Sequence, residues 1–160
     1  MEWIDKTLLD KVCVEAKASP RKRMNYNFHD SSDAKLQRML NALQPGTYLR
    51  PHRHLTPEKD EVFILLRGKM AVFFFDDEGD MTDMKVVDPL NGKYGVDIPA
   101  GQWHGLLVLE EDTVIFEVKH GPYEPLDPND FAPWSPAEGD DGVEEFVARL
   151  QGVVDQVLED

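Results

Sequence analysis

The chain has 160 residues, of which 41% are hydrophobic and 30% charged, and this composition suits one globular domain over residues 1–160 with no room for a second. Its formal net charge of −14, from 31 acidic and 17 basic residues, argues against a nucleic-acid partner, because nucleic-acid affinity rests on neutralising phosphates. A single cysteine and the absence of any run of about 18 apolar residues predict a cytoplasmic protein with no membrane partner.

An amphipathic helix is predicted inside the N-terminal region of residues 1–35, which we expect to form a helix followed by a loop. Apolar side chains recur there at helical spacing, opposite a charged face, at Leu8, Leu9, Val12, Cys13 and Ala16. The helix should end near Ser19, because the residue before a proline is pushed out of the helical conformation. A basic triplet at 21–23 then leads into a segment, 25–29, that is extended or looped.

Residues 36–120 are predicted to form a barrel. Short runs rich in β-branched, aromatic and aliphatic residues alternate with turn residues, which indicates seven or eight strands. The runs at 61–67 and 69–75 are nearly continuous and flank Gly68, as expected for strands covered on both faces, although periodicity alone leaves a buried helix open. Crossover helices are missing between the runs, so a mainly β, antiparallel sandwich or barrel is favoured over a parallel α/β sheet.

Two further segments follow the predicted barrel. Residues 121–140 are a proline-rich connector, which we expect to lie over the barrel through apolar side chains. Residues 141–160 are predicted as an acidic amphipathic helix that starts at a capping-box-like pair, Asp141 and Glu144. The apolar stripe of this helix can fold back over the barrel or pair with another copy.

Four side chains from separated runs form a candidate metal site. His52 and His54 are two residues apart, so on a strand both imidazoles point to the same face. Glu61 begins the next run and His104 a later one, and an antiparallel barrel can bring all four to one point. Three imidazole nitrogens and one carboxylate oxygen suit a divalent first-row metal, namely Zn, Fe, Mn or Ni.

The spacing of these residues resembles the two sequence motifs of the cupin superfamily. The matching positions are Gly46, His52, His54, Glu61, Gly68, Pro99, Gly101 and His104. The resemblance implies a double-stranded β-helix, an antiparallel jelly-roll barrel, between the two helices. Glu58 matches the usual interval after the second histidine, whereas Glu61 matches the interval to the glycine. We prefer Glu61, because Pro57 and the charged residues after it read as a turn.

Within this superfamily, the chain resembles the WbuC-type cupin metalloproteins, which are associated with bacterial surface-polysaccharide gene clusters. This resemblance rests on S-P-R-x-R-x-N-x-N-x-H at 19–29, Q-R-M-L-N-A-L-x-P-G at 37–46, R-P-H-R-H at 50–54, F-A-x-W at 131–134 and E-G at 138–139. It implies a metal-bearing barrel that forms a homodimer, and it leaves the last helix unmatched.

An anionic small molecule is the expected ligand of the site. Arg50 and Arg53 flank the histidine pair, and a guanidinium can hold a carboxylate or phosphate through two parallel hydrogen bonds. Either arginine can instead point outward and pair with an acidic residue. Tyr48 is a further candidate for substrate contact, and so is His29, whose alternative is a structural hydrogen bond.

The sequence is compatible with three functions. The first is a metal-dependent enzyme, an isomerase, lyase, hydrolase or dioxygenase, acting on a small anionic or sugar-derived metabolite. The second is a non-catalytic module that binds a metabolite or sugar. The third is a metal-independent sugar-nucleotide epimerase, which the paired histidines and the acid fit less well.

Overall fold

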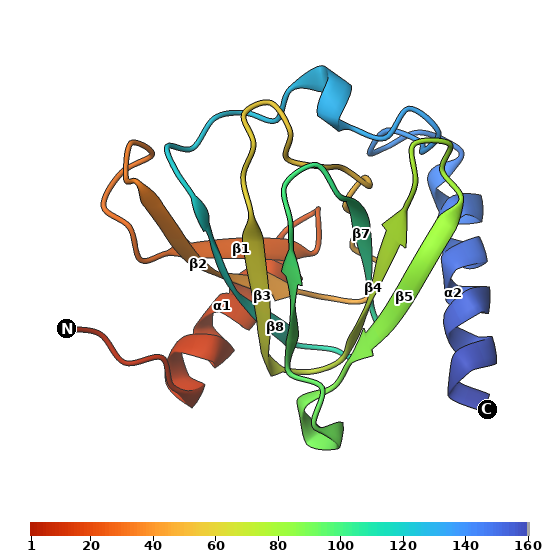
Figure 1. Cartoon of the computed structure of the whole chain (residues 1–160). Helices are drawn as coiled ribbons and strands as arrows, with labels where there is room; N and C mark the ends of the chain where they lie inside the picture. The colour runs from red at the N-terminus through yellow and green to blue at the C-terminus, as the bar shows by residue number, and fades with distance from the viewer. Residues whose placement is uncertain (160) are drawn as a thin grey trace.

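The computed structural model describes residues 1–159 and is built around two antiparallel β-sheets with one α-helix outside each (Figure 1). The prediction of a mainly β, antiparallel fold is confirmed. The helices, strands and 3-10 turns (η) are, in chain order, α1 Lys6–Ala18, β1 Arg23–Asn27, β2 Leu36–Leu43, β3 Glu61–Arg67, β4 Met70–Phe75, β5 Met81–Val87, η1 Pro89–Asn91, β6 Gly95–Ile98, β7 Trp103–Val108, β8 Thr113–His120, η2 Pro128–Asp130 and α2 Val143–Glu159.

The two sheets enclose the barrel core. The larger sheet has the strand order β1-β2-β8-β3-β6 and the smaller one β5-β4-β7. Buried aliphatic and aromatic side chains from both sheets meet between them: Leu43, Phe63, Leu65, Met70, Val72, Val87, Ile98, Val108 and Ile115. These apolar side chains fill one end of the interior, and the four residues of the candidate site lie toward the other end.

Strand β4 explains the long apolar run of the sequence. Met70 and Val72 point into the barrel core, whereas Phe73 and Phe75 belong to a second cluster on the outer face of the smaller sheet. Because both faces are covered, the strand has no polar side, as the run at 69–75 predicted.

The helices cover the outer faces of the sheets (Figure 1). The Asp5 side chain accepts a hydrogen bond from the backbone N–H of Leu8 (3.0 Å) and so caps α1, whose apolar face packs on Leu40 and Val114 of the larger sheet. The apolar stripe of α2 packs on the smaller sheet, so it folds back over the barrel, while residue 160 of the predicted helix lies outside the described residues. Within residues 1–159, neither helix has the length and apolarity needed to span a membrane.

The proline-rich connector crosses one end of the barrel (Figure 1) and fixes the segment that carries the histidine pair. The buried carboxylate of Asp130 accepts hydrogen bonds from the backbone N–H groups of Leu55 (3.1 Å) and Thr56 (2.8 Å). Its other oxygen accepts from Nε of Arg53 (3.2 Å), and the N–H of Ala132 donates to the carbonyl of Pro51 (2.9 Å). The connector therefore holds residues 51–56 in place as a neighbouring strand would.

Candidate metal centre

The structure brings the four predicted side chains together at the end of the barrel that the connector crosses. His52 and His54 come from the extended segment before β3, Glu61 is the first residue of β3, and His104 lies in β7. One donor atom from each of these residues lies within 4.8 Å of the other three. Glu58 is exposed in the turn before β3 and stands outside this group.

The donor atoms are arranged as ligands around a shared point. Oε1 of Glu61 is 2.7 Å from Nε2 of His104 and 3.3 Å from Nε2 of His54. All three atoms are buried, and none makes a hydrogen bond of acceptable geometry with any group of residues 1–159. Buried polar atoms without a partner are destabilising, and a cation between them would satisfy all three at once. The residues present therefore fit a metal ion.

Backbone carbonyls set the orientation of two of the imidazoles. Nδ1 of His52 lies 3.0 Å from the carbonyl oxygen of Arg50, and Nδ1 of His104 lies 2.9 Å from that of Gln102. A carbonyl only accepts, so each Nδ1 carries a proton, and Nε2 of the neutral imidazole keeps its lone pair. This is the tautomer that a metal ligand needs, and metal-bound histidines are commonly fixed in this way.

Burial and mutual proximity shift the pKa values in the cluster in opposite directions. Burial, and then the neighbouring His104, lowers the pKa of His52 to about 3, so this imidazole stays neutral. Burial acts to lower the pKa of His104, but the Glu61 carboxylate outweighs it and raises this pKa. Burial acts to raise the pKa of Glu61, and its two histidine neighbours outweigh it and hold the pKa well below the usual range. The cluster thus pairs a neutral imidazole, that of His52, with an ionised carboxylate, that of Glu61.

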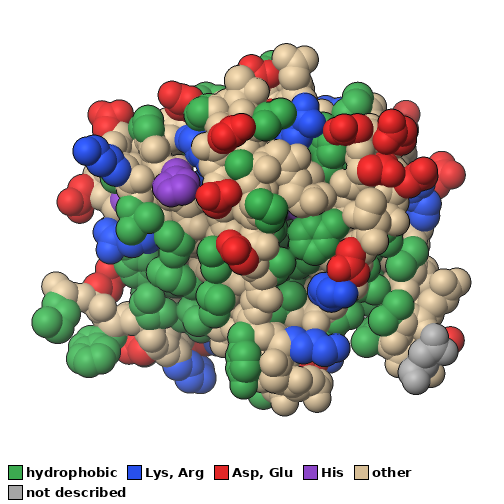
Figure 2. Space-filling model, in the orientation of Figure 1, with side chains coloured by type: hydrophobic (Ala, Val, Ile, Leu, Met, Phe, Trp, Pro, Cys, Tyr) green, Lys and Arg blue, Asp and Glu red, His purple; other side chains and the backbone are tan. Residues whose placement is uncertain are grey.

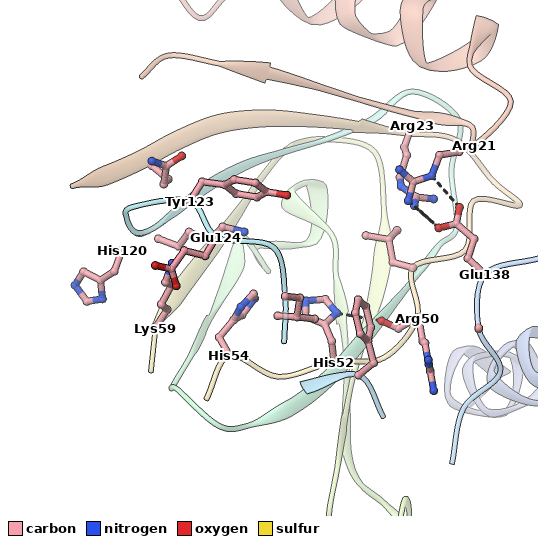
Figure 3. A pocket seen from close by; sticks show the side chains of 16 residues that line it. Arg21, Arg23, Arg50, His52, His54, Lys59, His120, Tyr123, Glu124 and Glu138 are labelled. Carbon is pink, nitrogen blue, oxygen red and sulfur yellow. Dashed lines mark hydrogen bonds and ion pairs between the residues drawn. The ribbon is translucent and has the colours of Figure 1, made fainter. Parts of the chain in front are cut away.

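Two adjoining cavities meet at this cluster. The outer one has a volume of about 470 Å³ and the inner one about 280 Å³, and the two share Arg21, Arg23, Leu49, His52 and Lys119. His54 lines the outer cavity, and Glu61 and His104 line the inner one. Figure 3 shows His52 and His54 along the outer cavity, with the arginines and Glu138 toward one side and Lys59 toward the other.

The four residues predicted to contact the substrate lie in different places in the structure. Arg50 lines the outer cavity, where its Nη2 donates to the carbonyl of Ala132 (2.8 Å). Arg53 lines neither cavity, because Asp130 holds its guanidinium against the connector. The Tyr48 hydroxyl donates to the carbonyl of Pro136 (2.8 Å) outside both cavities. His29 lines a separate surface pocket, with Nδ1 3.0 Å from the carbonyl oxygen of Arg38.

Sequence reasoning missed a buried charge pair inside the barrel. Lys119 lies directly opposite Glu61 in the pairing of β8 with β3, and its Nζ lies 2.8 Å from the Glu117 carboxylate, which also accepts from Asn41. Burial raises the pKa of Glu117. The signal in the sequence was the alternation of Glu117 and Lys119 in a strand that is mostly apolar, which places both side chains on the same face.

Comparisons with known structures show the fold. The TT1209 protein from Thermus thermophilus has a TM-score of 0.54 at 21% identity, with 75% of this chain and 97% of that chain covered. Oxalate oxidase in complex with the substrate analogue glycolate has a TM-score of 0.50 at 15% identity, with 69% and 57% covered. A cupin superfamily protein from Desulfitobacterium hafniense DCB-2 has a TM-score of 0.48 at 13% identity, with 61% and 76% covered. The matches to TT1209 and to oxalate oxidase show that the chain shares its fold with these proteins.

Sequence comparison gives the family. No curated protein shows significant similarity to the chain. The family model described as a domain of unknown function, DUF6016, matches residues 4–87, which is more than half of the chain and includes three of the four residues of the cluster. The chain therefore belongs to the DUF6016 family.

Proposed function

We propose that this protein is a metal-dependent cupin enzyme that acts on a small anionic or sugar-derived metabolite in bacterial surface-polysaccharide metabolism. The observation that carries the proposal is the cluster of His52, His54, Glu61 and His104, which lies where two cavities meet and in which His54, Glu61 and His104 have buried donor atoms without a hydrogen-bond partner. The motifs shared with WbuC-type cupins support the polysaccharide setting, and the single cysteine supports the cytoplasmic one.

A divalent metal held by the four side chains would polarise a substrate oxygen or activate a small molecule beside it. The chain's own residues prepare this chemistry. The carbonyls of Arg50 and Gln102 fix two imidazoles, which keeps the donor atoms in place before a ligand arrives. Leu49, Leu126 and Phe131 give the outer cavity an apolar wall that displaces water from a bound metabolite. The reaction that we propose is of the isomerase, lyase, hydrolase or dioxygenase class.

Charge favours an anionic ligand. The protein carries a net charge of −14, and Figure 2 shows acidic side chains scattered over one face of its surface. The outer cavity reverses this balance, because it is lined by two acidic residues and by five basic ones, Arg21, Arg23, Arg50, Lys59 and Lys119. A concave site of positive sign attracts anions from solution and orients them.

The experiment is metal analysis of the natively purified protein and of three variants. We expect about one metal ion per chain in the wild type and in His120→Ala, since His120 lines the outer cavity without belonging to the cluster. His52→Ala and His104→Ala should each lose the metal while keeping the wild-type circular dichroism spectrum. Retention of stoichiometric metal by both of these variants contradicts the proposal.

Two further measurements bear on the alternatives. Water-proton relaxation of the manganese-loaded protein distinguishes the enzyme from a non-catalytic binding module: exchangeable water on the ion supports the enzyme, and a closed shell supports the module.

We also propose a homodimer, because the large apolar side chains of Trp3, Ile4, Ile64 and Leu66 are exposed. Light scattering on the eluting protein tests the dimer, and a monomeric mass contradicts it.

A further inference from the structure

A carboxylate of the protein itself is held between two arginines at the edge of the outer cavity. Nε and Nη2 of Arg21 donate to the two oxygens of Glu138, at 2.9 and 2.7 Å, and Nη2 of Arg23 donates to the second oxygen at 2.8 Å. Figure 3 shows the two guanidinium groups turned toward Glu138. Both carboxylate oxygens are thus engaged in the geometry by which arginines recognise free carboxylates and phosphates.

This clamp, formed by Arg21 and Arg23, shares its cavities with the metal cluster. Both arginines line the outer cavity together with His52 and His54, and both also line the inner cavity together with Glu61 and His104. A ligand within these cavities can therefore reach the clamp at one end and the cluster at the other.

Within the clamp, Arg23 is held more firmly than the carboxylate that it binds. The Arg23 side chain is only 12% exposed, and its Nη1 donates to the carbonyl of Tyr48 (2.9 Å) and to the hydroxyl of Thr47 (3.3 Å). Glu138 is 40% exposed, lies in the connector rather than in a strand, and makes no side-chain hydrogen bond within residues 1–159 except to the two arginines. Because Glu138 reaches the arginines from a partly exposed position on the connector, a diffusible anion can compete with it for them.

We propose that Arg21 and Arg23 are the binding site for a carboxylate or phosphate group of the ligand, and that Glu138 occupies this site until the ligand displaces it. The inference deepens the proposed function and rests on it for the ligand's other end, which lies at the metal cluster. It defines the ligand class as a compact molecule with an oxyanion group at one end and a metal-binding oxygen at the other. Glu138 acts as an internal competitor that lowers the apparent affinity.

The test uses inorganic phosphate and succinate as probes, titrated calorimetrically into the full chain after removal of metal with a chelator. Glu138→Gln keeps the shape of the side chain and removes its charge. We expect it to bind the probe that matches the clamp about tenfold more tightly than the wild type does, the factor for a site closed about nine-tenths of the time. A preference for one probe identifies the ligand group as phosphate or carboxylate.

Glu124→Gln is the matched control. Glu124 lines the same cavity and its loss changes the net charge equally, but it makes no contact with the clamp. We expect less than about a threefold change in this variant, the size of a general electrostatic effect. Equal affinities in wild type, Glu138→Gln and Glu124→Gln overturn the proposal, and so does an equal gain in both variants.

Two additional substitutions in the Glu138→Gln background locate the probe. Arg21→Met should abolish the gain, and because the Arg21 side chain is 62% exposed this variant should fold normally. His104→Ala should keep the gain, since the clamp does not need the metal. Loss of probe binding in His104→Ala alone places the anion at the cluster and overturns the clamp. If the wild type binds no metal but the tighter probe binding of Glu138→Gln persists with His104→Ala, the proposed function is wrong and the clamp proposal holds.

Discussion

His52 and His104 face each other across a two-residue antiparallel bridge. The backbone N–H of His52 donates to the carbonyl of His104 at 3.0 Å, and the reverse bond is 2.9 Å long. Residues directly opposite in such a bridge project to the same face, and here the imidazole centroids are 4.5 Å apart. Backbone pairing thus sets the distance between two imidazoles of the cluster that come from remote parts of the sequence.

Substituting Glu61 and Glu58 in turn should show which of the two carboxylates binds the metal. We expect Glu61→Gln to weaken metal binding by more than the roughly 10–100-fold that loss of an outer hydrogen-bond partner causes. Glu58→Gln should bind as the wild type does, because its side chain is exposed in the turn before β3. Competition with a chromophoric chelator measures both affinities. A weaker metal complex in Glu58→Gln than in Glu61→Gln would mean that Glu58 is the ligand.

Metal affinity should fall as the pH is lowered. In the metal-free protein Glu61 raises the pKa of His104 above its ordinary value, so below that pKa a metal ion must displace a proton from His104. His52, with a pKa of about 3, releases no proton near neutral pH. The expected fall approaches about tenfold per pH unit below the His104 pKa for the one proton that His104 contributes.

Calorimetry of metal binding in two buffers with different heats of ionisation counts the protons released. Release that grows as the pH is lowered through the His104 pKa agrees with the structure. An affinity that stays constant from about pH 8 to about pH 5 disagrees with histidine ligation.

Breaking the buried pair of Glu117 and Lys119 should destabilise the barrel. Glu117→Ala leaves the ammonium of Lys119 without its carboxylate in the interior, and the loss in unfolding free energy should be about 3 kcal/mol. The double variant Glu117→Leu/Lys119→Met removes both charges and should lose less than Glu117→Ala alone. Urea unfolding measures each variant. A larger loss in the double variant would show that the pair itself supports the fold.

Gly68 is required between β3 and β4 by its conformation and by a close approach. Its φ is +84°, and a Cβ atom there would lie 2.7 Å from Cα of Thr113, which belongs to the backbone and cannot swing away. Gly92 has a similar φ of +75° with open space around it, so Gly92→Ala reports the conformational strain alone. We expect losses of about 1 kcal/mol for Gly92→Ala and about 3 kcal/mol for Gly68→Ala in thermal unfolding. Equal losses would contradict the close approach.

Local pattern was enough to predict much of the architecture. The apolar run of β4 and the apolar stripes of both helices reflect burial that each segment shows in its own sequence. The fixed intervals around His52, His54, Glu61 and His104 predicted that these side chains meet, and the structure places them together. That they hold a metal stays a prediction.

The contacts that the sequence did not predict depend on the path of the connector. Asp130 neutralises Arg53, and Glu138 reaches Arg21 and Arg23, across more than seventy intervening residues in each case. A proline-rich segment without periodicity contains no signal for such contacts, so the sequence could not tell which arginines face the cavity. Arg53 was expected there and lies outside it, whereas the basic triplet at 21–23 supplies two of the lining residues.

The most direct measurement is X-ray absorption on the metal-loaded protein. The spectrum should show imidazole scattering from three histidines together with an oxygen ligand, and His104→Ala should remove one imidazole shell. A first shell with no imidazole, or an unchanged shell in His104→Ala, would mean that the ion sits elsewhere and that these side chains do not form the metal centre.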